Sequence, residues 1–284
     1  MISIIIPCYN ASAFVEETLS SVLNQTYRDV EIIVVNDGST DNSENEILSF
    51  KDRRIRYFKQ SNKGQASACN LGISHAKGDY IKFFDADDVM DPEHIEKMVK
   101  RLEGNDQSIA FCEWGAFEND DVSSAKFSPL SNWKDMLPLD WLKIELKQYC
   151  DMLAGWRWLI PRTLLEKSGG WDERLTLNND FEFSIRLLLK ADKMLFAEGA
   201  KMYYRWAAPH AVSRKKTEKA FRDALLSTDL GCAYLLDREN SEEIKTICRK
   251  RYEMWLTRIP EEYRELRMSF RRPKEGGISK DDLI

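Results

Sequence analysis

The sequence lacks several features that would assign the protein to a class at once. No apolar run reaches the roughly 18 residues that a membrane-spanning helix needs, and the apolar start, Ile2 to Pro7, lacks the basic segment of a signal peptide. The six cysteines have neither the paired spacing of zinc sites nor that of disulfide frameworks. With 42 basic and 47 acidic residues, no basic excess indicates nucleic acid binding. We therefore expect a cytoplasmic protein with reduced thiols, of a size typical of enzymes.

The first 115 residues contain an alternation of strand and helix patterns. Short, apolar, β-branched runs have the length and composition of buried strands, and segments with an apolar face at helical spacing separate them. The predicted strands are 2–6, 31–35, 55–58, 80–84 and 108–114, and the predicted helices are 12–24, 40–50, 64–76 and one that starts at 91–92. This order predicts an α/β protein with a Rossmann-like, mostly parallel, doubly wound sheet.

Polar residues directly follow three of these predicted strands. The clusters are Tyr9-Asn10, Asn36-Asp37-Gly38-Ser39 and Asp85-Ala86-Asp87-Asp88. In doubly wound sheets ligands bind outside the carboxyl ends of the strands. The three clusters are therefore expected to meet at one edge of the sheet.

The acidic segment FFDADD, Phe83 to Asp88, is the strongest candidate for chemistry. Three carboxylates within four residues repel one another unless a cation lies among them. Carboxylate oxygens suit Mn²⁺ or Mg²⁺, which also bind substrate phosphates. The alternative is a solvated turn in which Asp88 or Asp91 caps the next helix.

Four other positions have a functional and a structural interpretation. Asp37 can accept hydrogen bonds from a base or ribose, or form a turn or helix cap. Lys63 and the free N–H groups of the helix that starts at Gly64 can bind phosphate. The structural interpretation is that this segment is a simple capped helix. One carboxylate of the segment 178–182, which includes Asp180 and Glu182, can act as a general base, or the segment is a helix N-cap. His210 lies in a loop-like stretch, and it is either a functional residue or a histidine that is simply exposed.

Taken together, these segments resemble the family 2 glycosyltransferases of the GT-A fold. The matching segments are SIIIPCYN (3–10), LNQTYRDVEIIVVNDGSTDNS (23–43), NKGQASACNLGISHAKGDYIKFFDADD (62–88), IPRTLLEKSGGWDE (160–173) and NDFEFSIRLL (179–188). They follow the family's order and cover residues 1–215. The resemblance implies an inverting, Mn²⁺- or Mg²⁺-dependent transfer of sugar from a nucleotide diphosphate donor, a UDP-sugar, to a hydroxyl of a glycan or lipid-linked acceptor. Such enzymes serve polysaccharide or glycoconjugate synthesis.

The resemblance also implies roles for single residues. Asp85 would hold the ribose or a metal-bound water, Asp87 would be the direct metal ligand, and Asp180 would be the catalytic base. Pro7, Tyr9 and Asn10 would contact the nucleotide, and Asp37 would contact its base or ribose. Trp156 and Arg157 would contact the acceptor or sugar. His210 would contact the metal or diphosphate.

Three positions depart from the family's pattern. Cys69 stands where the family usually has an arginine that contacts the base. Asn179 replaces the glutamate beside the catalytic base. The pair Tyr204-Arg205 is followed by Trp206, and His210 comes later than the family's histidine.

The domain organisation expected from these patterns is a GT-A domain over 1–215 and a helical region over 216–284. The GT-A domain would consist of a nucleotide-binding half, 1–115, and an acceptor half, 116–215. In the helical region, basic and aromatic residues would suit contact with the inner face of the membrane, whereas interleaved glutamates favour a solvated or homo-oligomer-forming appendage.

Two competing functions have distinct signatures. A dinucleotide-dependent oxidoreductase would have a G-x-G-x-x-G motif after the first strand, and Pro-Cys-Tyr-Asn stands there instead. A non-catalytic nucleotide-sugar or carbohydrate-binding protein on the same scaffold would be compatible with the departures at Cys69 and Asn179.

Overall fold

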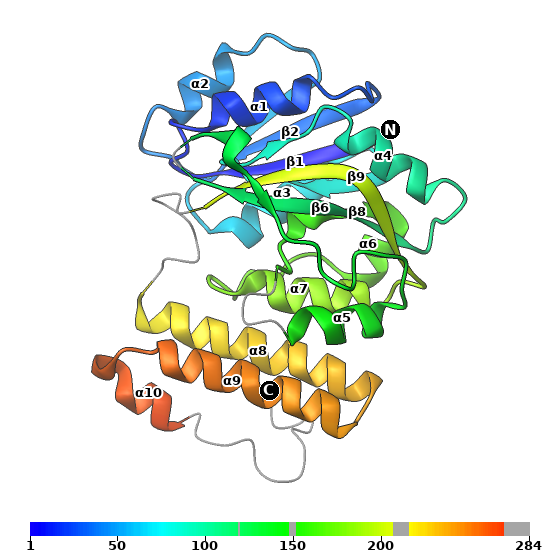
Figure 1. The fold of residues 1–284 in the computed structure, drawn as a ribbon. Coiled ribbons are helices and arrows are strands. Elements are labelled where there is room, and N and C mark those ends of the chain that lie inside the picture. Colours follow the sequence, from blue (N-terminus) through cyan, green and yellow to red (C-terminus); the bar gives the residue numbers. More distant parts are fainter. Residues whose placement is uncertain (119, 148–151, 207–215, 270–284) are drawn as a thin grey trace.

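One mixed sheet organises the described residues, which in this computed structural model are 1–118, 120–147, 152–206 and 216–269 (Figure 1). The strand order is β3 (Ile55–Lys59), β2 (Val30–Asn36), β1 (Ile2–Cys8), β4 (Tyr80–Phe83), β8 (Trp158–Pro161), β6 (Ile109–Phe117), β9 (Met194–Arg205) and β5 (Val89–Met90), with β7 (Lys126–Phe127) paired to β6. The α/β class predicted from the sequence is confirmed.

The predicted parallel arrangement holds for only part of this sheet. Strands β3, β2, β1 and β4 are parallel, and β6 is parallel to β9. Strand β8 is antiparallel to both β4 and β6, and β5 is antiparallel to β9. Strand β8 is short, and within β6 it pairs only with two of the first residues, Ala110 and Phe111. The mostly parallel sheet is therefore as predicted, since the long pairings are parallel and the antiparallel pairings of β8 and β5 are short.

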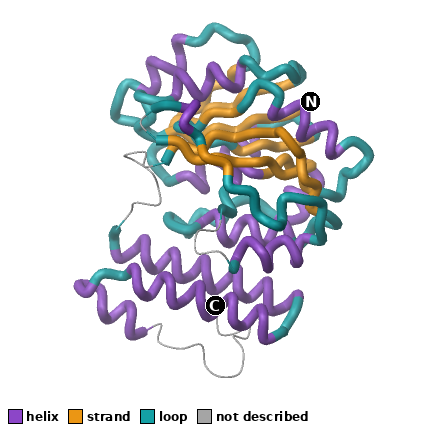
Figure 2. Tube along the Cα trace, in the orientation of Figure 1, coloured by secondary structure: helices purple, strands orange, loops and turns teal. Residues whose placement is uncertain are grey.

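Helices cover both faces of the sheet (Figure 2). In the first half they are α1 (Val15–Leu23), α2 (Ser43–Ser49), α3 (Gln65–His75) and α4 (His94–Leu102), close to the predicted ranges. The first helix begins three residues after Ser12, and no side chain caps it. The backbone N–H of Ser12 instead donates to Asp41 Oδ2 at 3.0 Å, so tertiary contact takes the place of the expected cap.

Apolar residues on both sides of β1 explain why this strand is apolar along its length. Ile4 and Ile6 contribute to the core beneath α1, α2 and α4, and Ile5 contributes to the core that includes α3. The remaining helices are α5 (Pro138–Leu146), α6 (Arg162–Ser168), α7 (Asn179–Leu188), α8 (Glu218–Arg238), α9 (Glu242–Arg258) and α10 (Arg264–Ser269), with short 3₁₀ turns η1 (Val122–Ser124), η2 (Gly155–Arg157) and η4 (Glu261–Tyr263).

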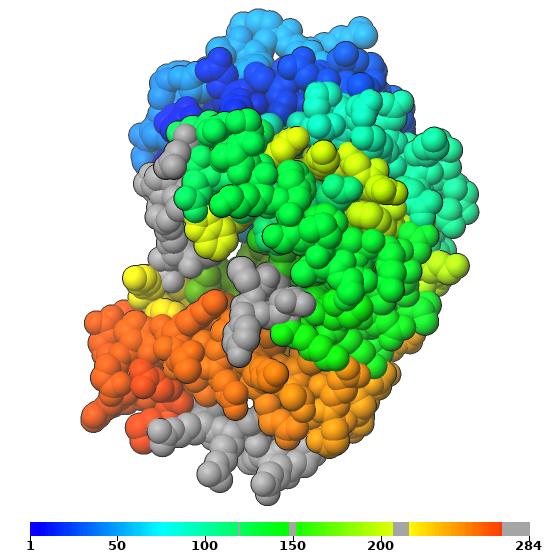
Figure 3. Space-filling view, in the orientation of Figure 1, coloured from blue at the N-terminus to red at the C-terminus, as the bar shows by residue number. Residues whose placement is uncertain are grey.

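The C-terminal helices form a further layer below α7. Helix α8 packs on α7 and α9 packs on α8, and α9 and α10 form the lower outer surface in Figure 3. Gly231 permits the close approach of α8, since a Cβ there would lie 2.5 Å from the ring of Phe181. One hydrophobic core runs from the sheet through α7 into α8 and α9. The helical C-terminal region is as predicted, whereas the domain boundary at residue 215 stays a prediction.

Candidate active site

The polar clusters after β1 and β2 hold each other in place. Asn10, in the left-handed region at φ 50°, donates its N–H to Ser39 Oγ at 3.0 Å and accepts the N–H of Thr40 at 2.8 Å. Pro7 is half-buried, and Tyr9 is 44% exposed. The two loops therefore form one unit at the carboxyl edge of the sheet, with the ring of Tyr9 presented to solvent.

Asp37 fixes the loop that precedes α3. Its buried carboxylate accepts hydrogen bonds from Gln60 Nε2 at 2.7 Å and from the backbone N–H groups of Lys63 and Gly64, both at 2.8 Å. These contacts reach a distant loop, so in this structure Asp37 forms neither a local turn nor a side-chain cap of α2 or α3. The side chain of Lys63 is exposed beside this turn. Contacts of either residue with a donor stay predictions.

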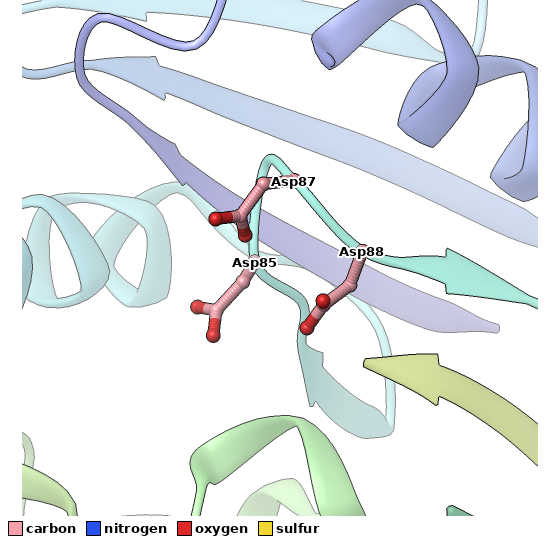
Figure 4. A group of neighbouring side chains, drawn as sticks. All are labelled: Asp85, Asp87 and Asp88. Atoms are coloured by element: carbon pink, nitrogen blue, oxygen red, sulfur yellow. The ribbon is translucent and has the colours of Figure 1, made fainter. Parts of the chain in front are cut away.

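The three aspartates of the acidic segment lie in one turn between β4 and β5 (Figure 4). One carboxylate oxygen of each lies within 4.8 Å of the others. Asp85 and Asp87 are half-buried, and Asp88 is fully buried. Burial raises the pKa of all three groups, and for Asp85 and Asp88 the charge of Asp87 raises it further. A divalent cation would relieve this repulsion.

Asp88 does not cap the following helix, which corrects the alternative considered for it. Its Oδ1 accepts the backbone N–H of Arg205, the last residue of β9, at 2.8 Å. Its carbonyl accepts the hydroxyl of Thr18 at 2.8 Å, and its Oδ2 has no hydrogen-bond partner among the described residues. The side chain therefore ties the acidic turn to β9.

Arg205 completes this connection with its guanidinium. Nε donates to the carbonyl of Asp87 at 2.8 Å, and the two terminal nitrogens form ion pairs with Glu17 and Asp120. The group lies between two rings, 4.8 Å from the centroid of Phe14 and 4.6 Å from that of Phe117. The sequence indicated Arg205 only as part of a Tyr-Arg pair, and its role in fixing the acidic turn depends on contacts with three distant segments.

The first turn of α7 brings Asp180 to the same site. Its Oδ1 accepts the N–H of Gly155 at 2.9 Å, and its charge contributes to the raised pKa of Asp85. Beside it, Asn179 Nδ2 donates to Gln65 Oε1 at 3.2 Å, and Gln65 Nε2 donates to Asp85 Oδ1 at 3.1 Å. The amide at position 179 thus links α7 through α3 to the acidic turn.

The turn η2 connects Asp180 with a buried lysine. Gly155 packs so closely on Trp171 that a Cβ would lie 2.8 Å from its ring. The next carbonyl, that of Trp156, accepts a hydrogen bond from Lys82 Nζ on β4. Lys82 is fully buried, and this burial lowers its pKa to about 8. A continuous connection therefore runs from Lys82 through η2 to the carboxylate of Asp180.

Trp156 and Arg157, the predicted acceptor contacts, are buried. The ring of Trp156 stacks on Tyr204 at 5.9 Å, and Arg157 pairs with the buried Glu145 at 3.0 Å. Arg157 also donates to the carbonyl of Met152 at 2.7 Å. In this structure neither side chain has the exposed surface that contact with an acceptor requires, because both serve the packing of η2.

Two further positions bear on the departures from the family's pattern. Cys69 is buried beneath the acidic residues, and burial together with the charges of Asp85 and Asp180 raises the pKa of its thiol. It therefore offers no charged contact to a base. His210 lies outside the described residues, so its role as a metal or diphosphate ligand stays a prediction.

The fold is similar to that of solved structures of TarS from S. aureus. Residues 1–349 of TarS in complex with UDP give a TM-score of 0.67 at 18% identity, covering 95% of this chain and 72% of that one. The complex with UDP-GlcNAc gives 0.69 at 16% identity, covering 93% and 83%. Together with the strand order and the acidic turn, this likeness defines the class as the GT-A fold.

The chain belongs to glycosyl transferase family 2, whose model matches residues 3–169. An uncharacterized glycosyltransferase of Rickettsia felis is 35% identical over 191 residues, which cover 66% of this chain and 31% of that protein. EpsJ of Bacillus subtilis, also an uncharacterized glycosyltransferase, is 32% identical over 210 residues, which cover 72% and 60%. The chain thus spans less than two thirds of either relative. Family 2 is the family that the motifs of the sequence predicted. Among the described helices, none is long and apolar enough to cross a membrane.

Proposed function

We propose that this glycosyltransferase moves a sugar from a nucleotide diphosphate donor, a UDP-sugar, to an acceptor hydroxyl by an inverting single displacement. The observation that carries the proposal is the cluster of Asp85, Asp87 and Asp88 at the carboxyl edge of the sheet, with Asp180 beside it. The TarS structures with UDP and UDP-GlcNAc support the donor class. A glycan or lipid-linked acceptor, in polysaccharide or glycoconjugate synthesis, fits the same chemistry.

The acidic turn fits a divalent cation. Its carboxylate oxygens are the hard ligands that Mn²⁺ and Mg²⁺ prefer, and like charges at this spacing favour a cation between them. Asp87 and Asp85 would hold the ion, with Asp88 committed to Arg205. When bound, the ion would stabilise the negative charge that develops on the leaving diphosphate.

In this proposal Asp180 would act as the general base. The N–H of Gly155 donates to its Oδ1, which fixes the direction of the carboxylate. As the acceptor hydroxyl attacks the anomeric carbon, its proton passes to Asp180 and the bond to the diphosphate breaks on the opposite face of the sugar. The partial burial of Asp180 limits the water that competes with the acceptor.

The loops after β1 and β2 would bind the nucleotide. Tyr9 offers an exposed ring, and Asn10 and Pro7 shape the neighbouring backbone. Asp37 would contact the base or ribose through the lone pairs that its three hydrogen bonds do not use, and the ammonium of Lys63 would pair with the diphosphate.

A non-catalytic binding protein on this scaffold makes a different prediction. With Mn²⁺ and a panel of nucleotide sugars, a cognate donor should raise the melting temperature, because ligands stabilise the state they bind. A transferase should also release nucleoside diphosphate slowly by transfer to water. Stabilisation without any release would favour the binding protein, and neither stabilisation nor release by any donor would contradict the proposal.

A further inference from the structure

A second surface region lies at the amino edge of the sheet, away from the acidic turn. It is formed by the end of α4, the segment 133–137 and the start of β9, at the right of Figure 1, whereas β1 ends at the left. Two hollows of about 630 and 430 Å³ adjoin there and share Arg101 and Asp135. We call the two hollows together the basic groove.

The charges that line the basic groove are opposite to those of the whole chain. The chain has an excess of acidic residues, yet five cationic and only two acidic side chains line the groove. Three of the cations, Lys100, Lys134 and Lys193, are exposed and form no ion pair with any described residue. Like charges gathered without partners repel one another, so an anion would be bound favourably there.

The lining of the groove is held in place. Arg101 pairs with Asp135 at 2.6 Å, and the other oxygen of Asp135 accepts the N–H of Phe196 at 2.9 Å. The backbones of Met136 and Met194 exchange hydrogen bonds of 3.0 and 2.9 Å. These contacts fasten the segment 133–137 to β9, so the backbone that carries Lys134 and Lys193 is fixed before a ligand arrives.

An aromatic pair adds an apolar surface to the groove. The ring of Trp133 lies 5.9 Å from that of Phe196, which in turn packs on Phe111 in the core. Tryptophan faces pack well against the apolar faces of sugar rings. The combination of unpaired cations and an aromatic surface therefore suits a ligand that carries both sugar rings and negative charge.

We infer that the basic groove binds an anionic sugar chain, with phosphate or carboxylate groups along its length. Two joined hollows with several separate cations suit a chain with repeated charges, and a concave surface suits a chain better than a flat bilayer. The further step, that this sugar chain is the acceptor held during synthesis, rests on the proposed function. Binding of the sugar chain to the groove does not depend on that function.

The test compares two triple variants with the same change of charge. Lys100→Glu, Lys134→Glu and Lys193→Glu reverse the unpaired cations of the groove. Lys51→Glu, Lys216→Glu and Lys250→Glu reverse exposed lysines outside its lining. Calorimetric titration at physiological salt uses three probes: inorganic polyphosphate, oligogalacturonate and neutral maltooligosaccharide.

We expect the wild type to bind at least one of the anionic probes, and the groove variant to bind it about tenfold or more weakly, because several charge contacts are lost together. The control variant should stay within about twofold of the wild type. Whichever anionic probe binds identifies phosphate or carboxylate as the recognised group. Equal weakening in both variants, no anionic binding, or equally tight binding of the neutral probe would overturn the inference. Donor hydrolysis is expected to be the same in all three proteins, so failure of the groove is distinct from failure of the transferase proposal.

Discussion

Two regions of this molecule bury carboxylates in different ways. At the acidic turn, Asp85, Asp87 and Asp88 lie within a few ångströms of one another, and burial together with their mutual charges raises the pKa of the group. In the helical layer, Asp229 on α8 is hydrogen bonded by the hydroxyl of Tyr252 on α9, and burial alone raises its pKa to about 6. Crowded acids repel one another and so favour a bound cation. A single buried acid with a neutral partner only lowers the stability of the fold when it is ionised.

The largest expected effect comes from the group that faces the acidic turn. Asp180→Asn keeps the shape of the side chain but cannot accept the acceptor's proton. We expect transfer to fall about 10²- to 10⁴-fold, with donor affinity within about twofold of the wild type. Initial rates and donor-dependent thermal shifts measure the two quantities. Loss of donor binding with the fold intact would contradict the assignment of Asp180 as base.

Removal of one acid from the turn should separate function from stability. Asp87→Asn deletes the predicted metal ligand, so we expect the Mn²⁺-dependent thermal shift with donor to disappear and transfer to fall by about 10²-fold or more. Without metal, the variant should melt no lower than the wild type, because one repelling charge is gone. A clearly lower melting temperature without metal would show that Asp87 serves the fold instead.

A smaller effect is expected from Lys82→Met, which acts through the backbone. The methionine fills a similar volume but cannot donate to the carbonyl of Trp156, so η2 and the N–H that holds Asp180 become less fixed. We expect kcat to fall about three- to tenfold with the donor KM unchanged. Lys147→Met, which removes an exposed ion pair with Glu243, is the control. An unchanged kcat, or equal losses in both variants, would refute the connection.

The smallest effect on transfer is expected in the helical layer. Asp229→Asn should leave activity unchanged and stabilise the protein at pH 7.5 by about 1–3 kcal/mol, from a pKa that is raised by about two units. Because the folded-state pKa is the higher one, Asp229 binds its proton more tightly when folded, and stability is lost as pH rises from about 4 to about 6. Urea unfolding across this range should show a smaller loss in Asp229→Asn. The exposed Asp237→Asn is the control, and identical pH profiles in wild type and Asp229→Asn would contradict this account.

The two halves of the sheet differ in how much of their structure the sequence predicted. Strands β1 to β4 and their helices are local patterns of apolar residues, and the rule that ligands bind at carboxyl ends placed Asn10, Asp37 and Asp85 at one edge. The direction of β8 was not predictable in this way, because a four-residue apolar run carries no information about which neighbour it pairs with or in which direction.

The sequence by itself determined the family, the first four strands and the identity of the acidic segment, because these depend on residue order and on periodicities of a few residues. The tertiary structure decided which contacts each acid makes. It assigned Asp88 to the backbone of Arg205, which lies 117 positions away, and joined Asp180 to Lys82 through η2. It also buried Trp156 and Arg157 and gathered the cations of the basic groove from three segments. Such contacts follow from packing between distant elements, and no local pattern encodes them.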